Sequence, residues 1–200
     1  MAELDNTSFM MKYDDESMIR QRLSAQKKRR LSIKNDTVEI DSVVYSFTRR
    51  EFPQFSMVVP ESLEEMPQNV AKQMFPYEDR PAIILSDSAF RICLAFNQSE
   101  RSIKNLPERL TSFQSYIQRV FPTAVFFSNG IYRLENSVEV AYYDYRYPAA
   151  DSDLYDFTFC TDLPDIELLG WFICPLARKG LWEPLMREMI RTIEIIPKEA

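Results

Sequence analysis

The residues that could carry chemistry are few, and the most suggestive is Cys174 in the segment WFICPLARKGLW (171 to 182). Its thiol follows an apolar run and precedes Arg178 and Lys179, and nearby cations favour a reactive thiolate. The chain contains no histidine, so no imidazole can serve as base for a cysteine or serine nucleophile. We therefore interpret Cys174 as a core thiol at the end of a strand.

Metal and nucleotide sites also lack their usual sequence signals. The other cysteines, Cys93 and Cys160, stand in apolar or aromatic segments without C-x-x-C spacing. The glycines number only 3 and are too scattered to form a phosphate-binding loop. We expect no catalytic residue, no bound metal and no cofactor.

Acidic side chains are the remaining candidates for chemistry. The segment YPAADSDLYD (147 to 156) carries a D-x-D pattern and a further acid, which could hold Ca²⁺ or Mg²⁺, but a solvated turn before a strand is our interpretation. The same acids, with two that follow, are candidates for a carboxylate-dependent hydrolase or transferase. The set is Asp151, Asp153, Asp156, Asp162 and Asp165.

Aromatic residues gather in the segment AYYDYRYP (141 to 148). Alternation along a strand puts three tyrosines on one face, and a tyrosine, an acid and an arginine on the other. Such clusters are typical of protein interfaces, although a tyrosine-rich core edge is the alternative. The predicted partner-binding residues are Tyr142, Tyr143, Asp144, Tyr145, Arg146 and Tyr147.

Two expectations follow for a partner bound at this strand. Acids such as Asp144 and Asp151 would stand at the rim and meet its basic or apolar segment. Replacing Tyr143 or Tyr145 with alanine would weaken binding while the fold survives.

The elements that would position these residues are mostly strands. Apolar, β-branched and aromatic runs predict strands over 40–48, 54–60, 82–98, 138–148, 154–162 and 166–175. We expect the run 82–98 to be a hairpin linked by Ser88 and Ala89, and a second hairpin to turn at Asn129-Gly130. The last three runs, joined by short turns, predict an antiparallel meander.

Three helices are expected between and after these strands. Acids followed by spaced apolar residues predict a short helix over 61–75 that is broken or shifted by Pro67. Apolar residues at helical spacing after Pro107 predict a helix that ends near Phe121 and covers a sheet face. A final apolar stripe over 181–193 predicts a covering helix after the last strand. The fold class expected is therefore α+β, with an antiparallel sheet of about seven strands and helices packed on its faces.

Charge divides the chain unevenly. Residues 1 to 16 are acidic, the block RQRLSAQKKRRLSIK (20 to 34) is basic, and the rest is acidic, for a net charge of -6. We expect residues 1–36 to be a flexible charged arm and 37–200 a single domain. The basic block could bind nucleic acid or an anionic surface, although an acidic body is unusual in a nucleic-acid module.

The beginning of the sequence carries no apolar segment of the kind that directs export. No later apolar run approaches the ~20 residues that a membrane helix needs. With an odd number of cysteines, this favours a reducing, cytoplasmic location and no membrane insertion.

The order of elements, with FPYEDRPAIILSDSAFRICLAF and GWFICPLARKGLWEPLMREMIRTIEI, resembles the PsbP-like fold. That superfamily includes the photosystem extrinsic protein and the Ran-binding Mog protein. The resemblance covers about residues 40 to 196. It implies a non-enzymatic protein-binding, adaptor or chaperone-like module with a protein or peptide partner.

Overall fold

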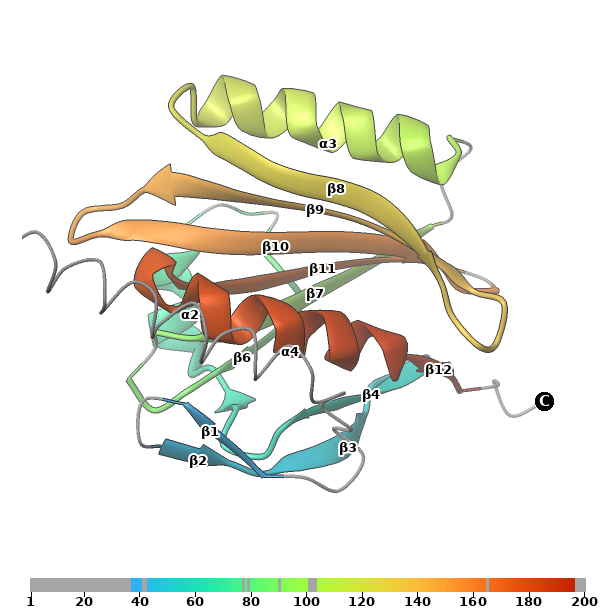
Figure 1. Cartoon of the computed structure of the whole chain (residues 1–200), viewed down its shortest axis with the longest axis horizontal. Coiled ribbons are helices and arrows are strands. Elements are labelled where there is room, and N and C mark those ends of the chain that lie inside the picture. Colours follow the sequence, from blue (N-terminus) through green and yellow to red (C-terminus); the bar gives the residue numbers. More distant parts are fainter. Residues whose placement is uncertain are drawn as a thin grey trace, which may run out of the picture. The chain divides into compact units, whose positions relative to one another are not determined.

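The computed structural model describes residues 37–40, 43–76, 78, 80–89, 91–100, 104–164 and 166–196. All of them belong to the unit Ile33–Ala200, and the predictions for the arm, 1–36, and for its basic block, 20–34, lie outside the described residues. Figure 1 shows the elements in chain order. They are β1 (Val38–Ile40), β2 (Val43–Tyr45), β3 (Phe47–Glu51), β4 (Phe55–Pro60), β5 (Glu64–Glu65), α2 (Gln68–Met74), β6 (Ile83–Ser86), β7 (Cys93–Glu100), α3 (Leu106–Val120), β8 (Val125–Arg133), β9 (Glu139–Pro148), β10 (Asp153–Asp162), β11 (Ile166–Pro175), η1 (Leu176–Arg178), α4 (Lys179–Arg191) and β12 (Glu194–Ile195).

A seven-stranded antiparallel sheet in the order β5-β6-β7-β11-β10-β9-β8 organises these elements. Strands β9, β10 and β11 pair in succession, which confirms the predicted meander. Smaller sheets are β12-β4-β3 and the β1-β2 pair. With its helices packed on the sheet, the chain has the predicted α+β architecture.

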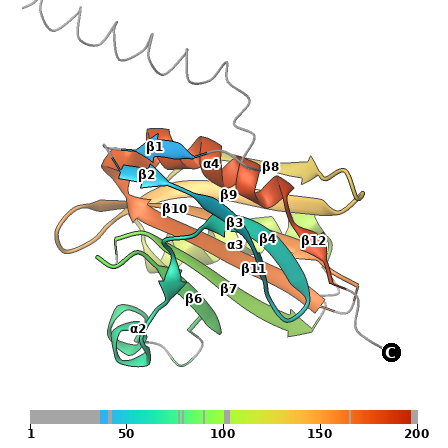
Figure 2. The same ribbon diagram turned by 90° about the horizontal axis from the view of Figure 1, so that it is seen from below.

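One face of the large sheet packs against α4 and the sheet of β3 and β4 (Figures 1 and 2). Aromatic rings fill this core, because alternate residues of the long strands β10 and β11 point toward it. Trp182 of α4 lies 5.2 Å from Phe172 and 5.0 Å from Tyr45, measured between ring centroids. The ring centroids of Phe55 on β4 and Phe96 on β7 are 5.3 Å apart. The predicted apolar stripe of the last helix is therefore buried in this core.

Helices α2 and α3 cover parts of the opposite face. Helix α3 begins at a capping box, in which the Asn105 side chain accepts a hydrogen bond from the Glu108 amide at 2.9 Å. Its sheet-facing residues pack on β9 and β10. Helix α2 begins directly after Pro67, since proline suits the first turn of a helix but not its interior. The prediction that Pro67 shifts this helix is confirmed.

Two predicted turns differ from the structure. Asn129 and Gly130 lie inside β8, which pairs with β9 over its length and has a register shift between Phe126 and Ser128. Gly130 faces the ring of Tyr142, and a Cβ at this position would come within 3.0 Å of that ring. The glycine therefore allows the Tyr142 ring to approach the backbone of β8 closely, and it does not form a turn. The hairpin of β6 and β7 is confirmed, but its connection runs from 87 to 92 rather than through Ser88 and Ala89 alone.

Candidate functional site

The six predicted partner-binding residues all lie on β9, the first strand of the meander. Their side chains alternate between the two faces, as expected from the strand period. Tyr143 and Tyr145 pack with residues of α3, whereas Asp144 meets Tyr155 and α4 on the other side. The strand thus belongs to two different environments.

On the α4 side, Asp144 is the centre of a buried polar cluster. Its carboxylate is 0% exposed and accepts hydrogen bonds from the Ser128 amide at 2.8 Å and the Tyr155 hydroxyl at 3.0 Å. Lys179 Nζ lies 3.7 Å from Asp144 Oδ2. A buried carboxylate needs such partners, so Asp144 holds the irregular part of β8 in place. Its predicted position at an exposed rim is wrong.

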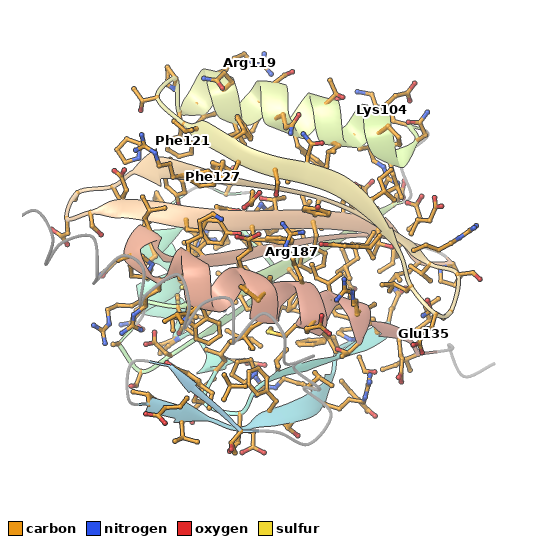
Figure 3. The ribbon with its side chains drawn as sticks, viewed as in Figure 1. Lys104, Arg119, Phe121, Phe127, Glu135 and Arg187 are labelled. Carbon is orange, nitrogen blue, oxygen red and sulfur yellow. The ribbon has the colours of Figure 1, made fainter. Side chains whose placement is uncertain are left out.

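Arg187 of α4 closes the same side of β9 (Figure 3). Its guanidinium lies 4.5 Å from the centroid of the Tyr142 ring, donates to Ser128 Oγ at 3.0 Å and pairs with Glu183 at 2.9 Å. It also donates to the Tyr132 hydroxyl. Burial raises the pKa of Glu183, but the hydrogen bonds from Lys179 and Arg187 outweigh it and leave this pKa below its usual value. Glu183 therefore carries its charge at neutral pH and pairs with both cations.

On the α3 side, two of the three tyrosines are covered. Tyr143 and Tyr145 are each 2% exposed and pack with Ile117 of α3. Tyr147 is partly exposed, and its ring stacks on Phe121 with 4.6 Å between centroids. A partner that leaves α3 in place would therefore reach Tyr147 first among the three.

Arg109 fixes the orientation of α3 on the sheet. Its Nη2 lies 2.8 Å from Asp162 Oδ2 and its Nη1 lies 3.0 Å from Glu167 Oε2, so this flank of the helix faces β10 and β11. Residues seven and eleven positions later share the flank because of the helical period. They are Tyr116, 53% exposed, and Val120, 43% exposed.

Strand β11 runs between the areas that the two helices cover. Its residue Leu169 packs with the α3 cluster, whereas Trp171 and Ile173 pack with the α2 cluster. All three side chains remain partly exposed. We call the residues Tyr116, Val120, Tyr147, Leu169, Trp171 and Ile173 the α2–α3 surface.

A polar pair lies beneath this surface on β10. Asp156 is 3% exposed, and its Oδ1 accepts a hydrogen bond from the Thr158 hydroxyl at 2.8 Å. It lies opposite Tyr145 on one side and Ile173 on the other. Burial raises the pKa of Asp156 to about 7, although hydrogen bonds from Thr158 and Tyr145 oppose this effect. The charge of this carboxylate therefore changes near neutral pH.

The candidate carboxylates for hydrolysis do not converge. Asp153 pairs with Arg146 at 2.5 Å, on the opposite sheet face from Asp156, because an odd number of positions separates the two on one strand. Asp162 shares the face of Asp156 but is roughly 20 Å along the strand. Asp151 is exposed, and Asp165 lies outside the described residues. Two-carboxylate glycoside hydrolysis needs its acids about 5 to 10 Å apart.

Within the described ranges, no group of three or more cysteine, aspartate or glutamate side chains gathers closely enough to hold a metal ion. The predicted loop with the D-x-D pattern therefore forms no such group among these residues. In the same part of the chain, no helix has both the length and the apolar character needed to cross a bilayer.

The three cysteines are all buried and unpaired with one another. Burial raises the pKa of Cys174 to about 12, and the opposing effects of Arg178 and Lys179 are smaller. The same cause raises the pKa values of Cys93 and Cys160 to about 12. The interpretation of Cys174 as a core thiol is confirmed.

The sequence did not reveal the α2–α3 surface as a unit. Its residues come from a helix and two strands, and only the sheet order and the packing of α3 on the sheet bring them together. The sequence carried no local signal for it, because residues 168 to 174 are all apolar and do not distinguish one face of β11 from the other. The Asp144–Ser128 contact depends on the register shift in β8, for which the sequence gives no local signal.

No protein-family model matches the chain, and no curated protein matches it. Among solved structures, the chain is similar to cyanobacterial PsbP (CyanoP) from Synechocystis sp. PCC 6803, with 11% identity and a TM-score of 0.58. The match covers 80% of this chain and 98% of that one. It is also similar to LpqN, described as involved in cell envelope biogenesis of Mycobacterium tuberculosis.

The LpqN match has 10% identity and a TM-score of 0.52, and it covers 82% of this chain and 100% of that one. At such identities, likeness establishes the fold alone. The chain has a PsbP-like fold, as the sequence resemblance implied.

Proposed function

We propose that this chain is a non-enzymatic protein-binding module of the cytosol that binds a partner on the α2–α3 surface. The observation that supports this most strongly is the row of partly exposed apolar side chains on β11. Tyr116 and Val120 of α3 are exposed on the flank of the helix that Arg109 directs toward β10 and β11. Contiguous exposed apolar residues mark interaction sites more often than scattered ones do.

The composition of the surface indicates the chemistry of the partner. Two tyrosines and a tryptophan supply aromatic anchors of the kind that carry binding energy at interfaces. Residues 36 to 200 contain 16 basic and 25 acidic residues, so their long-range field attracts a basic segment. The partner is therefore an apolar or aromatic segment with basic residues beside it.

Of the predicted tyrosines on β9, Tyr147 would contact the partner, because it is partly exposed whereas Tyr143 and Tyr145 are buried. Tyr143 and Tyr145 support the surface from beneath α3. The alternative, a carboxylate-dependent hydrolase or transferase, lacks a facing pair among its four described candidates, and the facing acids Asp162 and Glu167 are both held by Arg109. Binding of nucleic acid or an anionic surface through the basic block, 20–34, is a separate proposal on which no described residue bears.

The experiment is affinity capture from native cytosol with three baits, quantified by mass spectrometry. The baits are the wild type, Tyr116→Asp/Val120→Asp, and the control Val43→Asp/Val44→Asp, which changes exposed residues of β2. We expect one set of proteins to be captured by the wild type and the control and lost from the α3 variant. Equal capture by all three folded baits would refute the assignment of the surface.

A further inference from the structure

Strand β8 forms one edge of the large sheet. It is the last strand in the sheet order and spans 9 residues, and within the described residues its outer backbone makes no strand pairing. Three of its large apolar side chains are exposed: Val125 by 41%, Phe127 by 44% and Ile131 by 46%. An edge of this length offers a row of backbone donors and acceptors to another chain.

The other edge of the same sheet is protected in the ordinary way. Strand β5 has 2 residues, Glu64 and Glu65, both exposed and acidic. Short length and charge are the usual devices against unwanted strand pairing. In β8, by contrast, residues 125 to 132 read VFFSNGIY and contain no charged side chain. Proteins retain an unprotected edge where it serves recognition.

The side chains of β8 flank this edge on both faces. Phe127 lies on the α4 side, where Lys179 Nζ is 4.8 Å from the centroid of its ring and the Tyr155 ring is 6.3 Å away. Ile131 is opposite Ala141, which belongs to the α3 side. A strand added here would place alternate side chains beside Phe127 and beside Ile131.

We propose that the edge of β8 binds an extended segment of another protein by strand addition. The unpaired backbone specifies an extended polypeptide, because its donors and acceptors repeat at the strand period. Charge decides between occupants: a second copy has the same net charge of -6 and is repelled, whereas a segment with basic flanks is attracted. The segment is therefore apolar at alternate positions and basic at its ends. This site lies apart from the α2–α3 surface and does not depend on it.

The test uses a fluorescein-labelled peptide of alternating valine and threonine residues with lysines at both ends. Its control is the same peptide with N-methyl groups on consecutive amides, which keeps charge and side chains but blocks both edges, because successive residues direct their amides to opposite edges of a strand. Fluorescence anisotropy is measured with the wild type, with Val125→Lys, and with the matched change Val44→Lys on β2. Sedimentation of the wild type and Val125→Lys reports the oligomeric state.

We expect the unmodified peptide to bind the wild type and Val44→Lys alike, and to bind Val125→Lys about ten-fold more weakly. The methylated peptide should bind at least about ten-fold more weakly to all three. Equal binding of both peptides would mean that charge alone attracts them, and absence of binding would equally overturn the proposal. A wild-type dimer that Val125→Lys dissociates would assign the edge to a second copy instead. The capture experiment with Tyr116→Asp/Val120→Asp tests the α2–α3 surface separately, so either proposal can fail without the other.

Discussion

At the scale of single residues, Asp156 is the most unusual group in the molecule. Its carboxyl is buried on β10 beneath the α2–α3 surface, between Thr158 and Tyr145. In the folded protein its pKa is about 7 against an ordinary value of 3.8, so the folded state binds a proton that the unfolded state has released over that interval. Stability from this group is present at low pH and is lost as the pH rises through 7.

We predict that the free energy of unfolding of the wild type falls between pH 5 and pH 8 relative to that of Asp156→Asn. The amide accepts the same hydrogen bond from Thr158 but cannot ionise. Urea unfolding at several pH values measures the difference between the two proteins, which cancels the titration of other groups. Parallel pH profiles would show that Asp156 does not titrate in this range.

Cys174 provides a second test at this scale. The side chain is 0% exposed, so Cys174→Ala should lower the free energy of unfolding by about 1 kcal/mol through a small cavity. The thiol of the native protein should react with a thiol reagent only as the protein unfolds, because burial disfavours the thiolate. Rapid stoichiometric labelling of the folded protein would contradict this.

Tyr143 and Tyr145 behave differently from what the sequence suggested. Because both are 2% exposed beneath α3, replacing either with alanine is now expected to cost stability on the order of 3 kcal/mol. Any effect on partner binding would then be indirect. Denaturant unfolding of the two variants, alongside Tyr116→Ala at an exposed position, separates these effects, and unchanged stability in all three would show that α3 does not cover them.

At the scale of elements, a buried ion cluster adds to the apolar packing that attaches α3 to the sheet. Arg109 is 3% exposed and pairs with Glu167 and Asp162. Removing only the cation leaves Glu167 buried without its charge partner, which is strongly destabilising. The helix that carries Tyr116 and Val120 is thus tied to the two strands beside the proposed binding surface.

We predict that Arg109→Met lowers the free energy of unfolding by about 3 to 5 kcal/mol. The matched control is Arg133→Met. Arg133 is exposed, and its Nε lies 3.9 Å from Glu139 Oε1, so this variant should change the free energy of unfolding little. Urea denaturation of both proteins checks the contrast. Equal losses would mean that the Arg109 cluster contributes no more than a surface pair.

Two glycines in regular elements should respond in opposite directions to alanine. At Gly170 of β11, a Cβ would lie 2.2 Å from the Phe159 ring, so Gly170→Ala should cost about 1 to 3 kcal/mol by overpacking. At Gly180 of α4 a Cβ meets nothing within 4 Å, and Gly180→Ala should add up to about 1 kcal/mol. Thermal unfolding measures both, and a stable Gly170→Ala would show that Phe159 moves aside.

Elements with a strong local period could be predicted from the sequence. The helix after Pro107 and the strands of the meander lie where apolar spacing indicated, because each buries one face over many residues. Asn129-Gly130 failed as a turn because pairing with β9 and the ring of Tyr142 outweigh the local preference. Of the candidate site, Tyr147 was found on its strand, but Trp171 and Tyr116 join the same surface only through the sheet order and the orientation of α3, which are tertiary features.

At the scale of the whole molecule, the two proposed recognition features lie apart on one sheet. The α2–α3 surface offers aromatic side chains between two helices, and the β8 edge offers backbone. The face that meets α4 is occupied by the aromatic core and by the charged cluster around Asp144. Because the two faces of the sheet differ in this way, the six neighbouring residues on β9 alternate between two environments.

Site-specific photo-crosslinking in cells reports whether a protein partner contacts the α2–α3 surface. A photoreactive phenylalanine analogue replaces Tyr116, Val120 or, as the control, Val44, and cells are irradiated before the chain is recovered under denaturing conditions. We predict discrete heavier products from positions 116 and 120 and none from position 44. Crosslinks from position 44 alone, or none from the two α3 positions, would contradict the proposed function.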